Sequence, residues 1–130
     1  MDKDFWVAVS RNDFSIPEGH TLENLTGILF SYLGSTDPVL RDDTAYAVYA
    51  HWLKQERYSS DVLRSHVDQL LSNLEKGIGE SDSDTVFLRA FSVLLLAEIV
   101  HNDNKKPLLD AAQVKAILEK GICRTYAKDI

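Results

Sequence analysis

The sequence has little of what stabilises small secreted proteins. Its 130 residues include one cysteine, Cys123, and three prolines, so an intramolecular disulfide bond is excluded. A lone cysteine is typical of a reducing compartment, and we expect a cytoplasmic protein. Basic residues number 14 against 20 acidic ones, a formal net charge of −6. This excess disfavours nucleic acid as a partner, because phosphate binding needs a clustered basic surface.

Signals for export and membrane insertion are also scarce. The acidic start Met1–Asp4 lacks the basic and apolar regions of a signal peptide. The longest apolar run, Val86–Val100, contains Arg89 and Glu98 and falls short of the ~20 apolar residues that a membrane span requires. We therefore expect no membrane association, and a buried helix of a soluble protein at this run.

Helical spacing of apolar residues recurs along the chain, without strand-type alternation between Asn-Gly or Asp-Gly turns. Helix starts are indicated at Asp37-Pro38, Ser59-Ser60 and Ser83-Asp84. Asp110 and Gln113 form a capping-box pattern before the last helix. The sequence predicts a single all-α domain over residues 1–130, with helices near 4–11, 21–34, 38–55, 60–77, 84–102 and 110–128.

An internal repeat narrows the architecture. Leu74–Ile78 recurs as Leu118–Ile122, 44 residues later, and Asp37–Arg41 is echoed by Asp84–Arg89. Helix pairs of ~40–47 residues are the repeating units of HEAT and armadillo solenoids. The repeat predicts antiparallel pairs 38–77 and 84–128, stacked as a short HEAT-like right-handed α-solenoid. The alternative is a chance match between common helix-forming residues.

The predicted helix 84–102 is apolar around nearly its whole circumference. Such a helix has to be covered on all sides, yet only one further helix follows it. We expect this cover to come from a second copy of the chain or from protein beyond residue 130.

Three stretches, Leu40–Tyr46, Phe87–Ser92 and Tyr126–Ile130, resemble an uncharacterised bacterial family of unknown function with longer members. The resemblance runs from about residue 20 to the end and matches the N-terminal part of the family. It implies an α-helical, solenoid-like fold and a cytoplasmic location, but no established activity. The family's segment that follows Asp129-Ile130, which contains Gly, Trp and His, is not in this chain.

Candidate chemical groups are few. Glu98 and His101 have the Glu-x-x-His spacing of di-iron bundles, but the second such pair and the two further glutamates are missing. We expect no metal or cofactor, Glu98 paired with a cation or amide, and His101 at a helix C-terminus. Cys123 has no histidine partner at a recognisable spacing, and we expect no catalytic residue.

A binding surface is the remaining hypothesis, and its residues are Arg41, Tyr46, Tyr49, Trp52 and Arg89. The two arginines occupy matching positions of the two repeats and could line a groove for an anionic ligand. Their structural alternative is to bridge carboxylates or carbonyls between repeats. For the aromatic residues the alternative is core packing.

The sequence therefore favours a non-catalytic helical-repeat module of unknown biochemical function that binds another protein or a second copy of itself. The alternative is the N-terminal part of an enzyme whose catalytic residues lie beyond residue 130. The two hypotheses differ in whether the gene continues past codon 130.

Overall fold

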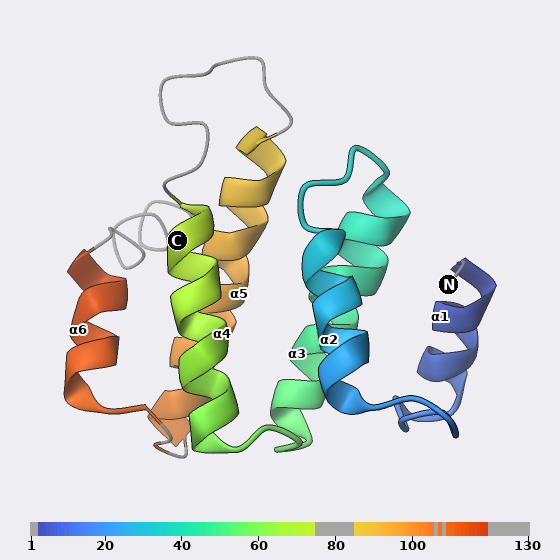
Figure 1. Ribbon diagram of the computed structural model, residues 1–130, viewed down its shortest axis with the longest axis horizontal. Helices are drawn as coiled ribbons and strands as arrows, with labels where there is room; N and C mark the ends of the chain where they lie inside the picture. The colour runs from blue at the N-terminus through green and yellow to red at the C-terminus, as the bar shows by residue number, and fades with distance from the viewer. Residues whose placement is uncertain (1–2, 75–84, 106, 108, 120–130) are drawn as a thin grey trace.

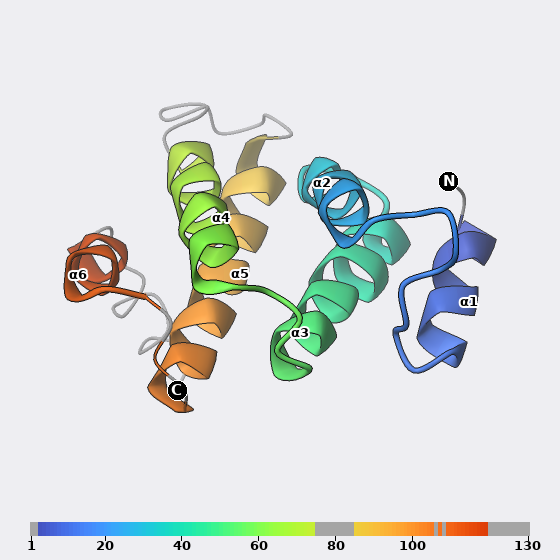
Figure 2. The same cartoon turned by 60° about the horizontal axis from the view of Figure 1, so that its bottom comes forward.

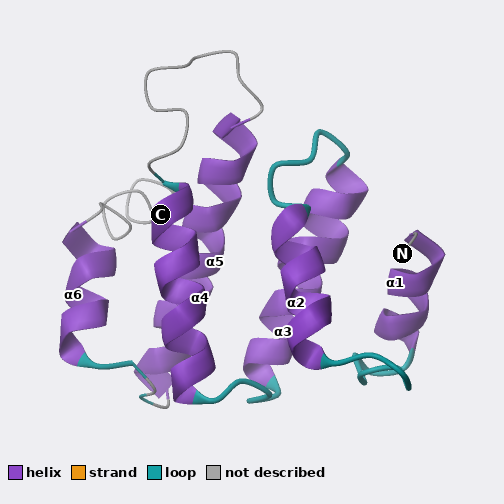
Figure 3. Cartoon of the chain, viewed as in Figure 1, coloured by secondary structure: helices purple, strands orange, loops and turns teal. Residues whose placement is uncertain are grey.

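The computed structural model describes residues 3–74, 85–105, 107 and 109–119, and all regular structure within them is helical. Figures 1 and 3 show the arrangement. The elements are α1 (Lys3–Arg11), α2 (Leu22–Ser31), the π-helix η1 (Val39–Tyr46), α3 (Ala47–Lys54), α4 (Ser60–Asn73), α5 (Thr85–Lys105) and α6 (Ala111–Glu119). The expected all-α fold is confirmed over these ranges. No helix in the described part of the chain is both long and apolar enough to cross a membrane.

Helices begin where side chains bind the first unpaired backbone amides. The Asp37 carboxylate accepts from the amide of Val39 at 2.9 Å. Ser59 accepts from the amide of Val62 at 3.3 Å, and Asp110 accepts from that of Gln113 at 2.8 Å. These three predicted starts are confirmed. The start at 83–84 and the repeated residues 75–78 and 120–122 lie outside the described residues.

The segment from residue 38 to residue 55 is not one continuous α-helix, as the spacing predicted. It begins as the π-helix η1 and becomes α-helical at Ala47, whose amide donates to the carbonyls of Asp42 and Thr44. A π-helix has a wider turn than an α-helix. Here the wider turn lies where η1 packs against α1, α2 and α5 at once. A 3.6-residue spacing does not reveal this change because it arises from packing.

The helices form pairs that lie side by side (Figures 1 and 2). In Figure 1, α2 and α4 lie toward the viewer, and α3 and α5 lie behind them. The pairs are joined mainly through the rear layer, where η1 and α3 pack on α5. The first helix, α1, packs on η1, and α6 packs on α4. Fully buried side chains from both pairs form the core, among them Trp6, Leu25, Leu29, Tyr49, Trp52, Leu70, Leu95, Leu96 and Ile99.

The apolar helix α5 is covered on two flanks, by α3 and α4. Leu95, Leu96 and Ile99 are buried, whereas Ala90 is exposed and Leu94 keeps 37% of its surface. Among the described residues, α5 thus keeps an exposed surface at Ala90 and Leu94. Cover of this surface by a second copy of the chain or by protein beyond residue 130 stays a prediction.

Candidate functional site

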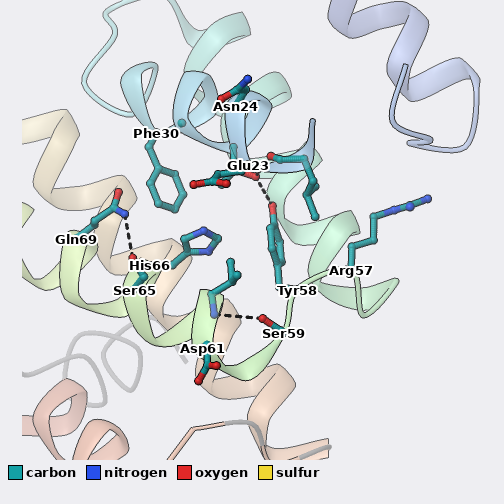
Figure 4. A pocket seen from close by; sticks show the side chains of 14 residues that line it. Glu23, Asn24, Phe30, Arg57, Tyr58, Ser59, Asp61, Ser65, His66 and Gln69 are labelled. Atoms are coloured by element: carbon teal, nitrogen blue, oxygen red, sulfur yellow. Dashed lines mark hydrogen bonds between the residues drawn. The ribbon is translucent and has the colours of Figure 1, made fainter. Parts of the chain in front are cut away.

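A groove runs between α2 and α4, and we call it the α2–α4 groove. It consists of two adjoining cavities of about 780 and 760 Å³, and Phe30 and Gln69 line both. The first cavity is lined by α2, the loop before α4, and α4 itself (Figure 4). The second continues to the far end of α4 and reaches Leu88 of α5. Together they extend over most of the length of both helices.

The groove exists because the helix pairs meet through α3, η1 and α5, behind α2 and α4. On the α2 side, Gly27 removes a side chain from the wall of the first cavity. Apart from its chain neighbours and the backbone of α2, no atom lies within 4 Å of the position that a Cβ of Gly27 would occupy. The groove is therefore open at the middle of α2.

Aromatic rings form the inner wall of the first cavity. The His66 ring has its centroid 5.1 Å from that of Phe30 and 4.9 Å from that of Tyr58. Both neighbours stand nearly perpendicular to the imidazole, at 71° and 82°. Figure 4 shows the imidazole of α4 between Phe30 of α2 and Tyr58 of the preceding loop. These T-shaped contacts hold the three rings in fixed positions.

A hydrogen-bond chain fixes the Tyr58 side of this wall. The Thr26 hydroxyl donates to the carbonyl of Leu22 at 2.8 Å. Its single proton is then used, so at 2.8 Å it accepts the hydroxyl proton of Tyr58. Burial raises the pKa of Tyr58, which keeps the phenol protonated. Tyr58 is thus a fixed wall rather than a free donor to the groove.

His66 of α4 lines the same cavity. The hydroxyl of Tyr49, which is fully buried, lies 2.9 Å from Nδ1 of His66. We assign the hydroxyl as the donor, which places the imidazole proton on Nε2. Burial lowers the pKa of His66 to about 4, so the ring is neutral near pH 7. The groove wall therefore carries a neutral N–H donor.

Charged residues of the groove are mostly acidic. Glu23, Asp61 and Asp68 line it, against Arg57 as the basic residue. The Nε of Arg57 donates to Gln55 at 2.5 Å, and Figure 4 shows this side chain extending away from His66. With His66 neutral, the lining residues carry a net negative charge.

Arg41, from the predicted binding surface, joins η1 to α5. It donates to the carbonyl of Ser35 at 3.2 Å and to the Asp42 carboxylate at 3.0 Å. The guanidinium carbon lies 4.3 Å from the ring centroid of Phe87 and 5.0 Å from that of Phe91. These contacts bury most of Arg41, whose side chain is 12% exposed. The Arg41 guanidinium therefore contacts groups of the chain itself, which is the structural alternative for this residue.

Tyr49 and Trp52 have no exposed surface. The indole N–H of Trp52 donates to the carbonyl of Phe14 at 2.7 Å, and Tyr49 lies behind the groove wall. Neither side chain can contribute to an exposed surface, because both are packed in the core. This is the structural alternative that the sequence left open.

The other predicted residues lie on or near α5. Tyr46 donates to the Glu98 carboxylate at 2.6 Å, and Arg89 is half-buried near the start of α5. His101 is exposed, one turn before the helix ends at Lys105. No group of three potential metal ligands occurs within the described ranges. Cys123 lies outside them.

None of the five predicted surface residues lines the α2–α4 groove. The sequence did contain a signal for His66. It lies three residues after Leu63 and four before Leu70, on the apolar face of the helix. A histidine on a buried helix face has to find a polar partner. The partner, Tyr49, and the opposite wall come from other helices.

Comparisons with known proteins give one match. A family described as "Protein of unknown function (DUF2785)" matches residues 74–128. This supports similarity to a family of unknown function over the segment that contains α5 and α6. The residues of α2 that line the groove precede the match. No curated protein and no solved structure matches the chain.

Proposed function

We propose that this chain is a helical-repeat module that binds another protein through the α2–α4 groove. The observation that carries the proposal is the pair of adjoining cavities along both helices. Adjoining, open cavities fit a chain segment better than an enclosed small molecule, whose surface a pocket covers by 70–90%. In the same proposal the units of a HEAT-like solenoid are α2 with η1–α3 and α4 with α5, which pack on each other, rather than the pairs 38–77 and 84–128 that the repeat predicted.

The dimensions support a polymeric partner. Helix α4 has 14 residues, which corresponds to about 21 Å at 1.5 Å per residue. An extended chain covers about 3.3 Å per residue, so six or seven residues would span the groove. Repeat proteins bind their partners on extended surfaces of this type, formed by successive units.

Gly27 allows a direct test. A Gly27→Trp variant places a large side chain over the first cavity, and Gly27→Ala leaves the cavity open. Peptides are selected from a random heptapeptide display library on the wild-type protein, and their dissociation constants are measured on both variants. The proposal expects binders that lose at least tenfold in affinity on Gly27→Trp and less than twofold on Gly27→Ala.

Lys54→Trp is the matched control, since Lys54 is exposed at the end of α3 and outside the groove. It adds the same indole and is expected to leave affinity unchanged. Binders whose affinity is insensitive to Gly27→Trp, or a selection that yields no binder, would contradict the proposed function.

A further inference from the structure

We infer that the partner segment is a basic peptide bound in an extended conformation. This inference rests on the proposed function and adds the chemistry of the ligand. Three observations support it: the charge of the groove, the polar groups along its two walls, and the combination of a carboxylate with aromatic rings in the first cavity.

The charge of the groove favours a basic ligand. Three carboxylates line it, those of Glu23, Asp61 and Asp68, and the lining guanidinium is that of Arg57. The Asp61 carboxylate forms an ion pair with Arg64 at 3.7 Å, so the negative charge that a ligand meets comes from Glu23 and Asp68. The Arg57 side chain extends away from His66 in Figure 4, while Glu23 lies on the opposite wall from the imidazole. The chain as a whole carries a net charge of −6. A basic segment would therefore be attracted both over a distance and at contact.

The polar groups of the walls favour an extended backbone. Asn24 on one wall, and Gln69 and Asn73 on the other, present amide side chains that both donate and accept. Serine hydroxyls also line the groove, at positions 31, 35, 59, 65 and 72. Those of Ser35, Ser59 and Ser65 already accept a hydrogen bond from within the chain, and that of Ser31 donates to the carbonyl of Ile28. A helical ligand has already paired its own backbone groups and requires an apolar groove. An extended segment leaves its N–H and C=O groups free for these side chains.

The first cavity can hold one cationic side chain. The methylene stem of a Lys or Arg side chain would cover Phe30, and its charged end would reach the Glu23 carboxylate. A cation near an aromatic face gains further electrostatic attraction. In the same complex the Nε2–H of His66 donates to a backbone carbonyl of the ligand, while Nδ1 keeps its hydrogen bond with Tyr49. One basic side chain would thus contact both the aromatic wall and the carboxylate of this cavity.

A second copy of this chain fits less well, because it would bring another six negative charges to an acidic groove. Association of like-charged molecules is opposed at low ionic strength. The test below nevertheless distinguishes this occupant.

Fluorescent heptapeptide libraries of equal hydrophobicity, one with Lys and Arg and one with Asp and Glu, are titrated against the full chain at 50 and 300 mM salt. We expect binding of the basic library, and an affinity that falls severalfold at the higher salt. Glu23→Gln and Asp68→Asn should each weaken a selected basic peptide by about two- to fivefold, the range for exposed ion pairs.

Asp43→Asn is the matched control, because Asp43 is exposed on η1 outside the groove and the variant loses the same charge. Its affinity should equal that of the wild type. Glu23 and Asp68 are exposed, so their variants should fold, and circular dichroism of each variant verifies this. The circular-dichroism spectrum of the complex minus that of the free protein should show no helical signal from the bound peptide.

The outcomes separate the two proposals. Binders that respond to Gly27→Trp but are acidic, uncharged or helical would overturn the inference and leave the proposed function standing. Dimerisation of the free chain that Gly27→Trp abolishes would also overturn it, in favour of a second copy. If no peptide of any composition binds in a way that Gly27→Trp weakens, both the inference and the proposed function are overturned.

Discussion

The hydroxyl of Tyr49 on α3 lies 2.9 Å from Nδ1 of His66 on α4, and both side chains are buried. This hydrogen bond connects the first helix pair to the second. It also sets the orientation of the imidazole in the wall of the α2–α4 groove. Stability and the proposed binding site therefore depend on the same contact.

Tyr49→Phe should reduce the free energy of unfolding by about 1–3 kcal/mol, because it leaves the buried Nδ1 without a donor. Urea denaturation followed by circular dichroism measures the change. Tyr46→Phe is a useful comparison, since its bond to Glu98 is only partly buried and its loss should cost less. Equal effects for the two variants would contradict the importance of burial at Tyr49.

Stability should fall in acid because of His66. Its pKa is about 4 in the folded chain and 6.5 in the unfolded chain, so between these values only the unfolded state binds the proton. The contribution of neutral His66 to the free energy of unfolding is fully present above pH 6.5. As the pH falls from 6.5 to 4, the free energy of unfolding decreases by about 3 kcal/mol. Denaturation is measured from pH 7 to pH 4 on the wild type and on His66→Gln.

Other groups titrate in the same range, so the informative quantity is the difference between the two proteins. His66→Gln should flatten the pH dependence, whereas His101→Gln, a change at an exposed histidine, should leave the wild-type profile. Parallel profiles for wild type and His66→Gln would show that burial does not exclude the proton from His66.

Gly27→Ala should stabilise the protein by about 0.5–1 kcal/mol. Gly27 lies within α2, and an added Cβ meets no atom within 4 Å. Alanine restricts the unfolded chain and has the higher helix propensity. Thermal unfolding should show a higher midpoint. A lower midpoint would mean that the wall of the groove is closer to α2 than the geometry indicates.

Arg41→Lys should cost about 1 kcal/mol, although it keeps the charge. A lysine cannot donate to Ser35 and Asp42 while also lying over the rings of Phe87 and Phe91. A double-mutant cycle with Phe91→Leu, followed by denaturation, measures the coupling between η1 and α5. Additive effects would show that the guanidinium and the ring act independently.

The sequence by itself determined the helices and most of their starts. Ser59, Asp37 and Asp110 cap the residues that follow them within the same segment, so three or four neighbouring residues contain the whole interaction. Apolar spacing likewise identified the buried faces of α2 and α4. Helix caps and apolar spacing each involve residues of one segment, so the sequence of that segment is sufficient to predict them.

Only the tertiary structure decided which side chains are accessible and where the groove lies. Tyr49 and Trp52 follow the spacing of either a core or a surface stripe, and packing against Phe14, Phe30 and His66 buried them. The π-helix η1 packs against α1, α2 and α5, which come from three other parts of the sequence. The two walls of the first cavity of the α2–α4 groove come from separate segments, residues 22–30 and residues 57–69. Its width is set by how α3 and η1 pack on α5, which no single segment encodes.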